Sequence, residues 1–185
     1  MFEKLKKLAG YYKPYKGLFF SDMFFAILGA AITLVIPLIV RYITSSVVEL
    51  PVSEATGIIV KLGIFMIALV AVEAFCNFYI AYYGHIMGAR IERDMRNEIF
   101  GHYQKLSFAF YDNQKVGHLL SRITADLFDI SELLHHGPED LVISIIKFAG
   151  AFGILVMVNE KLALAAFFFV PFLILYAVIF NLKMK

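Results

Sequence analysis

Four long apolar runs constrain this chain more than any other feature of its sequence. They cover residues 18–43, 58–83, 139–158 and 162–182. Each is about 20 residues or longer, so a helix rising 1.5 Å per residue can cross a hydrocarbon layer of about 30 Å. The runs are continuous rather than alternating, which favours membrane-spanning helices over a β-barrel. A mean hydropathy of +0.76 agrees, because a soluble domain of 185 residues cannot hide so much apolar surface. We therefore expect an all-α membrane protein with four transmembrane helices.

The basic residues predict how these helices are oriented. Residues 1–17 contain five lysines and one glutamate, the connection 44–57 contains no Lys or Arg, and the connection 84–138 is rich in both. The positive-inside rule then places both termini and the second connection in the cytoplasm, in a cell membrane of bacterial type. A signal peptide is excluded because the first run is too long and three more follow. Residues 1–17 form either an amphipathic lead-in helix at the interface or a basic tail without structure.

Residues 84–138 lack a span-length apolar run but keep helical periodicity. Apolar residues recur every three or four positions on both sides of a central stretch. Before that stretch they are Met87, Ile91, Met95, Ile99, Tyr103 and Leu106. After it they are Leu120, Ile123, Leu127, Ile130 and Leu134. Oppositely charged residues four apart, Arg90 with Asp94, Glu92 with Arg96 and Arg122 with Asp126, support the solvent faces. We expect the second and third spans to continue into the cytoplasm as a helical hairpin whose tip lies within 106–126.

The tip carries three aromatic residues, Phe108, Phe110 and Tyr111, where lipid cannot reach them. Asp112 is a good N-cap residue, and Gly117 can end a single turn in the left-handed conformation. The sequence therefore predicts a very short helix from Asp112 to Gly117, across the tip. The rings either contact another protein or pack into the end of the hairpin itself, and the sequence leaves both open.

The stretch LSFAFYDNQKVGHLLSRITAD, residues 106–126, resembles the first intracellular loop of ABC exporters. The run YKPYK at 12–16 resembles that family's entry to its first membrane helix, and EKLAL at 160–164, with Pro171 further on, resembles the start of its fourth. The resemblance covers essentially all of 1–185, in the right order and spacing. Residues 18–185 would then be the N-terminal part of the exporter's transmembrane domain.

The resemblance implies a mechanism. In ABC exporters the second and third membrane helices extend into the cytoplasm, and a short coupling helix at their tip sits in a groove of a nucleotide-binding domain. Closure of two such domains on ATP switches the transport cavity between inward and outward access. The residues that the resemblance assigns to this coupling are Phe108, Phe110, Tyr111, Asp112, Gly117, Arg122 and Asp126.

Two departures from the family bear on function. The family's membrane domain has six helices and this chain has four, and the chain contains no G-x-x-x-x-G-K-[ST] loop. We therefore expect part of an exporter subunit, truncated or split, that pairs with an identical or different second subunit. ATP and magnesium would bind in a nucleotide-binding domain outside this chain, which has no catalytic motif of its own although the complete transporter would be an ATPase. The alternative is a non-transporting regulatory protein that binds a cytoplasmic partner through the hairpin. A net charge of +2 without a patch gives no indication of nucleic acid.

Ionisable residues inside the spans are further candidates, because each is costly in lipid unless it is paired or hydrated. Glu73 and Asn77 lie one turn apart in the second span, and Lys147 lies at a similar depth in the third. A Glu73–Lys147 pair is geometrically possible. These residues either fix helix packing or line the translocation cavity.

Other polar residues near the membrane are assigned no role. We expect Asp22, near the start of the first span, to reach the interface, and the pair His135 and His136 to be polar surface. No metal site is expected, and a membrane enzyme is excluded because no nucleophile–base pair lies in a span. The cargo is not identified by any residue.

Overall fold

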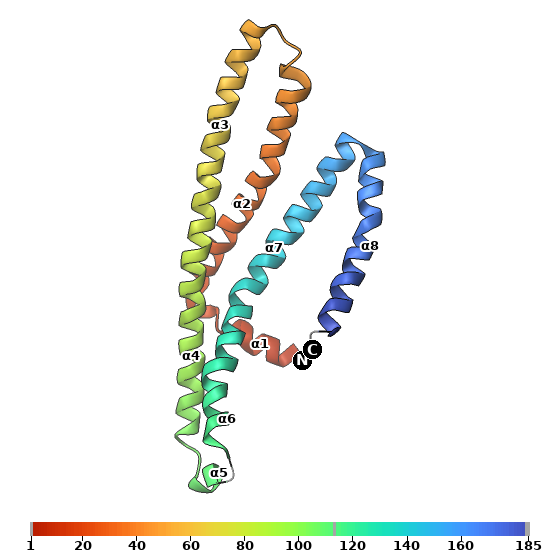
Figure 1. The fold of residues 1–185 in the computed structure, drawn as a ribbon. Helices are drawn as coiled ribbons and strands as arrows, with labels where there is room; N and C mark the ends of the chain where they lie inside the picture. The colour runs from red at the N-terminus through yellow and green to blue at the C-terminus, as the bar shows by residue number, and fades with distance from the viewer. Residues whose placement is uncertain (1, 113, 184–185) are drawn as a thin grey trace.

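The computed structural model describes residues 2–112 and 114–183, and every regular element within those ranges is helical (Figure 1). The α-helices are α1 Phe2–Gly10, α2 Lys16–Tyr42, α3 Val52–Tyr79, α4 His85–Tyr103, α5 Phe108–Asp112, α6 Val116–Ser121, α7 Leu127–Val158 and α8 Glu160–Lys183. A 3₁₀ turn, Lys13–Tyr15, precedes α2. Single π-helical turns follow α2, α3 and α6, at Ile43–Val47, Ile80–Gly84 and Arg122–Asp126.

Four helical segments are long and apolar enough to cross a membrane, which confirms the predicted fold class. They are Lys6–Val47, Val52–Tyr103, Val116–Val158 and Glu160–Lys183. The second is 52 residues long and the third is 43. At 1.5 Å per residue both greatly exceed a hydrocarbon layer of about 30 Å. The excess forms the predicted hairpin: α4 runs beside the first part of α7 and beside α6, and α5 lies at the lower end (Figure 1).

The two predicted apolar stripes face each other along this hairpin. Met87, Ile91 and Met95 of α4 pack with Leu127 of α7 in a buried cluster, which we call the seam. Ile91 is fully buried. The partly buried residues around the seam include Ile99, Ile130 and Leu134 from the predicted stripes. Burial of apolar side chains from both helices in an aqueous region stabilises the hairpin through the hydrophobic effect.

One of the three predicted charge pairs forms. Arg96 pairs with Glu92, as the spacing indicated. Asp94 instead accepts hydrogen bonds from Tyr15 and from its neighbour Arg93. No ion pair joins Arg122 to Asp126 in the described chain, because these residues form a π-helical turn, in which residues five apart rather than four are aligned.

The lead-in segment is helical and packs on the hairpin. α1 lies crosswise to the long helices (Figure 1). The Tyr15 hydroxyl donates to Asp94 Oδ2 over 2.6 Å, and the Tyr12 hydroxyl donates to the Leu134 carbonyl. Tyr11 and Lys7 both donate to the Glu98 carboxylate, and these bonds lower the pKa of Glu98 below its ordinary value. The segment thus contacts both α4 and α7, which ties the two arms of the hairpin together.

The connection between α7 and α8 is a single residue, Asn159. Its side chain Oδ1 accepts the Leu162 N–H over 3.1 Å and so caps the start of α8. Beyond this turn the two helices diverge (Figure 1). Ala163 is the one residue of Glu160–Lys183 that is buried, so almost the entire surface of α8 is left open.

Candidate functional site

The tip of the hairpin contains a short helix, as predicted, but the predicted position was wrong. The helix α5 spans Phe108–Asp112, so Asp112 ends it instead of starting it. Ser107, a residue type favoured at N-caps, precedes it, and the Ser107 carbonyl accepts the Phe110 N–H over 3.0 Å. Gly117 is the second residue of α6, and no glycine of the described chain has a positive φ. Asn113, which the predicted turn included, lies outside the described residues.

The three aromatic side chains of the tip differ in their surroundings. The Tyr111 hydroxyl donates to the Tyr103 carbonyl over 2.6 Å, which anchors α5 to the end of α4. Phe110 is partly buried, and its ring meets the Tyr111 ring edge-on at 5.4 Å between centroids. Phe108 is 89% exposed. Tyr111 therefore holds the tip together, whereas Phe108 is free to contact another molecule.

An apolar hollow lies beside α5. Its lining comes from α4, α5, α6 and the π turn and includes Phe100, Tyr103, Tyr111, Val116, Leu119 and Ile123. Leu119 is buried, but Phe100 and Val116 are more than half exposed. Together with Phe108, this hollow gives the tip an apolar surface in a region where water is the solvent. Such surfaces commonly mark contacts with other proteins.

Arg122 and Asp126 lie on the π turn between α6 and α7, and both are exposed. The turn is held to the opposite arm because Arg96 Nε donates to the Ile123 carbonyl over 3.3 Å. The predicted coupling residues from Phe108 to Asp126 thus lie together on the end of one hairpin. All of them are exposed except Phe110 and Tyr111, which are partly buried.

The structure does not bring together the three candidate residues within the spans, Glu73, Asn77 and Lys147. Glu73 of α3 accepts a hydrogen bond from the Thr33 hydroxyl of α2, with 2.8 Å between the oxygens. Lys147 is exposed on α7, and no ion pair links it to Glu73 in the described parts of the chain. Asn77 is exposed on α3. Glu73 thus links two neighbouring helices, α2 and α3.

Two expectations about polar residues near the membrane were wrong. Asp22 does not reach the interface, since it is 1% exposed, and His135 is not surface, since it is 2% exposed. Both lie where α2 and α7 pack together, close to the buried Glu139. The spacing of His135 and Glu139, four residues apart on one helix, was the available signal for this cluster. Nothing local to Asp22 indicated its partners.

Comparison with known proteins gives consistent matches. The model of the ABC transporter transmembrane region matches residues 19–185. The uncharacterized ABC transporter ATP-binding protein YwjA of Bacillus subtilis (strain 168) is 45% identical over 180 residues, which are 97% of this chain and 31% of that protein. YknU of the same organism, likewise described as an uncharacterized ABC transporter ATP-binding protein, is 31% identical over 92% of this chain and 29% of its own length. A multidrug export ATP-binding/permease candidate of Staphylococcus aureus (strain NCTC 8325 / PS 47) is 28% identical over 95% of this chain and 31% of its own length. The chain therefore spans about a third of the length of these relatives.

Proposed function

Because this chain belongs to the ABC transporter transmembrane region family, we propose that it forms part of the translocation pathway of an ATP-driven exporter. The hairpin carries the coupling function, and its tip docks on a nucleotide-binding domain through residues 106–126. The observation that carries this proposal is the contrast within α5. Tyr111 is bonded to the hairpin, while Phe108, three residues earlier, is 89% exposed. A rigidly held tip with a free aromatic ring suits insertion into a pocket of a partner.

The hairpin is built to transmit displacement. α3, the π turn and α4 form one helical segment of 52 residues, so a displacement passed from α5 through the short connection 104–107 to the end of α4 reaches the membrane along one continuous helix. The seam and the contacts of the lead-in segment keep α4 and α7 together as one body. Movement of the nucleotide-binding domain on ATP would therefore shift both helices in the membrane.

The remaining partners follow from the same proposal. ATP and magnesium bind in the nucleotide-binding domain, and the relatives' names include ATP binding. The open surface of α8 packs against lipid and against a second transmembrane subunit. Both termini and the hairpin lie in the cytoplasm and the spans lie in the cell membrane, as the distribution of lysine and arginine favours.

The test replaces Phe108 by Ala in the transporter assembled with its nucleotide-binding domains in lipid nanodiscs. Phe128→Ala is the matched control, since Phe128 is an exposed phenylalanine of α7 away from the tip. Spin labels at the outer ends of α2 and α7 report the change in their separation when ATP is added. We expect Phe108→Ala to reduce the ATP-driven change at least about fivefold, equivalent to about 1 kcal/mol of lost coupling. The control variant Phe128→Ala should leave the ATP-driven change intact. An undiminished change in Phe108→Ala would refute the docking role.

A further inference from the structure

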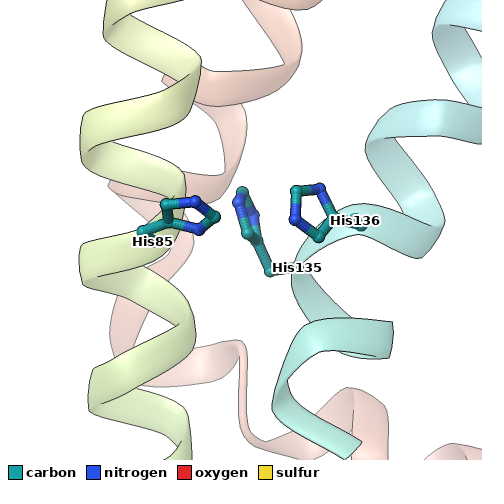
Figure 2. Close-up of side chains that lie close together, drawn as sticks. All are labelled: His85, His135 and His136. Carbon is teal, nitrogen blue, oxygen red and sulfur yellow. The ribbon is translucent and has the colours of Figure 1, made fainter. Parts of the chain in front are cut away.

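Five polar side chains converge where α2, α4 and α7 meet. Asp22 comes from α2, His85 from the start of α4, and His135, His136 and Glu139 from α7. Figure 2 shows the His135 ring between those of His85 and His136. The centroid of the His135 ring lies 4.9 Å from that of the His85 ring and 4.4 Å from that of the His136 ring. The expected coupling surface lies at the other end of the hairpin, so this cluster is separate from it.

The inner members of the cluster are buried without hydrogen-bond partners. Asp22, His135 and Glu139 are 1%, 2% and 7% exposed. Both carboxylate oxygens of Asp22, both ring nitrogens of His135 and Oε2 of Glu139 lack a hydrogen bond within the described chain. Burial of such groups without a partner is costly, and native proteins rarely leave five such atoms together. A bound ion would remove much of this cost, because it could contact a carboxylate oxygen of each acid and one of the two ring nitrogens of His135.

The spacing of the ligand atoms suits a metal ion. One atom each from Asp22, His135 and Glu139 lie within 4.8 Å of one another, and the same holds for His85, His135 and His136. The His135 Nδ1 atom is 3.9 Å from Glu139 Oε2. Ligands about 2.0–2.2 Å from a zinc-like ion lie about 3–3.5 Å apart, so small side-chain rotations would complete a site.

The helical segment that faces α7 makes room for the imidazole of His135. A Cβ atom at Gly84 would lie 2.0 Å from His135 Cε1, so only glycine admits the ring in its present position. Gly84 closes the π-helical turn Ile80–Gly84. One turn further on, a Cβ at Gly88 would lie 3.5 Å from the His135 Cβ. The backbone of this segment is therefore shaped around His135.

We propose that Asp22, His135 and Glu139 bind a divalent transition-metal ion, with an imidazole of His85 or His136 as an additional ligand. Two carboxylates and neutral imidazoles balance the charge of a divalent ion, which a buried site requires. Imidazole ligands favour zinc, nickel, copper or iron over magnesium and calcium, which take oxygen ligands. The ion joins α2, α4 and α7 at the cytoplasmic end of the spans and holds the first span to the hairpin. This site departs from the sequence expectation of no metal.

The experiment uses the protein in lipid nanodiscs, purified with a histidine-free affinity tag and stripped with a chelator. Zinc is added, excess metal is removed, and bound zinc per chain is measured by plasma mass spectrometry. Cobalt is added in parallel, because its visible absorption bands report the ligand set directly. Calorimetric titration with zinc, and with magnesium as a contrast, gives the affinities. We expect one zinc per chain with a Kd below about 10 µM and no heat of binding with magnesium.

Matched pairs of variants test the ligands. Glu139→Gln is compared with Asp140→Asn, the exposed acid next to it, and His135→Gln with His118→Gln, an exposed histidine of α6. Gly84→Ala, which displaces the imidazole without removing a ligand, is compared with Gly101→Ala, where a Cβ meets no atom within 4 Å. The first member of each pair should bind zinc at least about tenfold more weakly than its control.

The decisive measurement is made on the wild type, so a variant that fails to fold does not obscure the result. Wild-type protein that takes up no zinc or cobalt in this range overturns the proposal. Equal zinc binding by Glu139→Gln, His135→Gln and their controls overturns it as well, because the ion would then lie elsewhere. Saturable binding that is lost in all three test variants, with an altered cobalt spectrum, supports it.

Discussion

Two of the antiparallel helical hairpins in the described chain are stabilised in different ways. The hairpin of α4, α6 and the first part of α7 closes on itself, through the seam, the lead-in segment and the bond from Tyr111 to Tyr103. The hairpin of α7 and α8 has a one-residue turn, and Ala163 is the one buried residue of α8 among those described. In water the first gains the hydrophobic effect from its own packing. In lipid the second gains little from contact between its helices, so its apolar surfaces remain available to lipid or to other helices.

The largest expected change in the free energy of unfolding comes from a substitution in the seam. Ile91→Ala removes a fully buried side chain, which should lower the free energy of unfolding by about 2–4 kcal/mol. Ile174→Ala in α8, where the side chain is 60% exposed, should cost under about 0.5 kcal/mol. Unfolding in mixed micelles at increasing denaturant measures both. An equal cost at the two positions would show that α8 is buried by a partner, and the contrast between the hairpins would then fail.

A substitution at the tip should have a smaller effect on stability. Tyr111→Phe removes the hydrogen bond to the Tyr103 carbonyl and leaves that acceptor without its protein partner, at a cost of about 1 kcal/mol. Tyr176→Phe in α8, an exposed ring, is the control and should change nothing measurable. Amide hydrogen exchange at residues 104–112 measures the opening of the tip. Unaltered exchange in Tyr111→Phe would show that α5 is held by other contacts.

Within the membrane, we expect polar contacts between α2 and α3 to contribute to their association. Thr33→Val removes the donor to Glu73 and should destabilise the α2–α3 pair by about 0.6 kcal/mol, the average for such bonds in membrane proteins. Thr33→Ser keeps the hydroxyl and should be nearly neutral. The same unfolding assay applies. A Val variant as stable as the Ser variant would assign the α2–α3 contact to packing alone.

The smallest expected effect is a dependence of the lead-in segment on pH. The hydrogen bond from Tyr11, and then that from Lys7, lower the pKa of Glu98 below its ordinary 4.5. The contact is therefore fully formed above pH 4.5 and is lost as the pH falls through the lower folded-state pKa. Burial, followed by the bond to Glu98, raises the pKa of Tyr11 from 10.0 to about 12, so the contact weakens again as the pH rises towards 12.

A fluorescent reporter can follow this dependence, because the natural chain contains no tryptophan. Leu8→Trp places one beside the seam, and its emission should shift to longer wavelength in acid as the segment detaches. Glu98→Gln should abolish the acid transition. An acid transition that persists in Glu98→Gln would assign it to another group.

The sequence predicted what depends on local pattern and missed what depends on packing between distant segments. The spans and the seam were predictable because length and a period of three to four residues determine them. The position of α5 was not, because Ser107 and Asp112 are both good N-cap residues and only the Tyr111 bond to α4 distinguishes them. The Asp22–His135 contact joins residues 113 positions apart, and no local pattern contains it.

The π-helical turn Ile80–Gly84 also sets the rotational phase of everything that follows it. Such a turn holds one residue more than an α-helical turn, and one residue corresponds to about 100° around the helix axis. Met87, Ile91 and Met95 face Leu127 only with this offset included. Conversion of the turn to regular α-helix with all its residues kept would rotate α4 by about 100° relative to α3, whereas deletion of a single residue there would make the helix regular and keep the phase of α4. The turn is therefore the one place in this segment where a single residue can be removed without turning the seam away from α7.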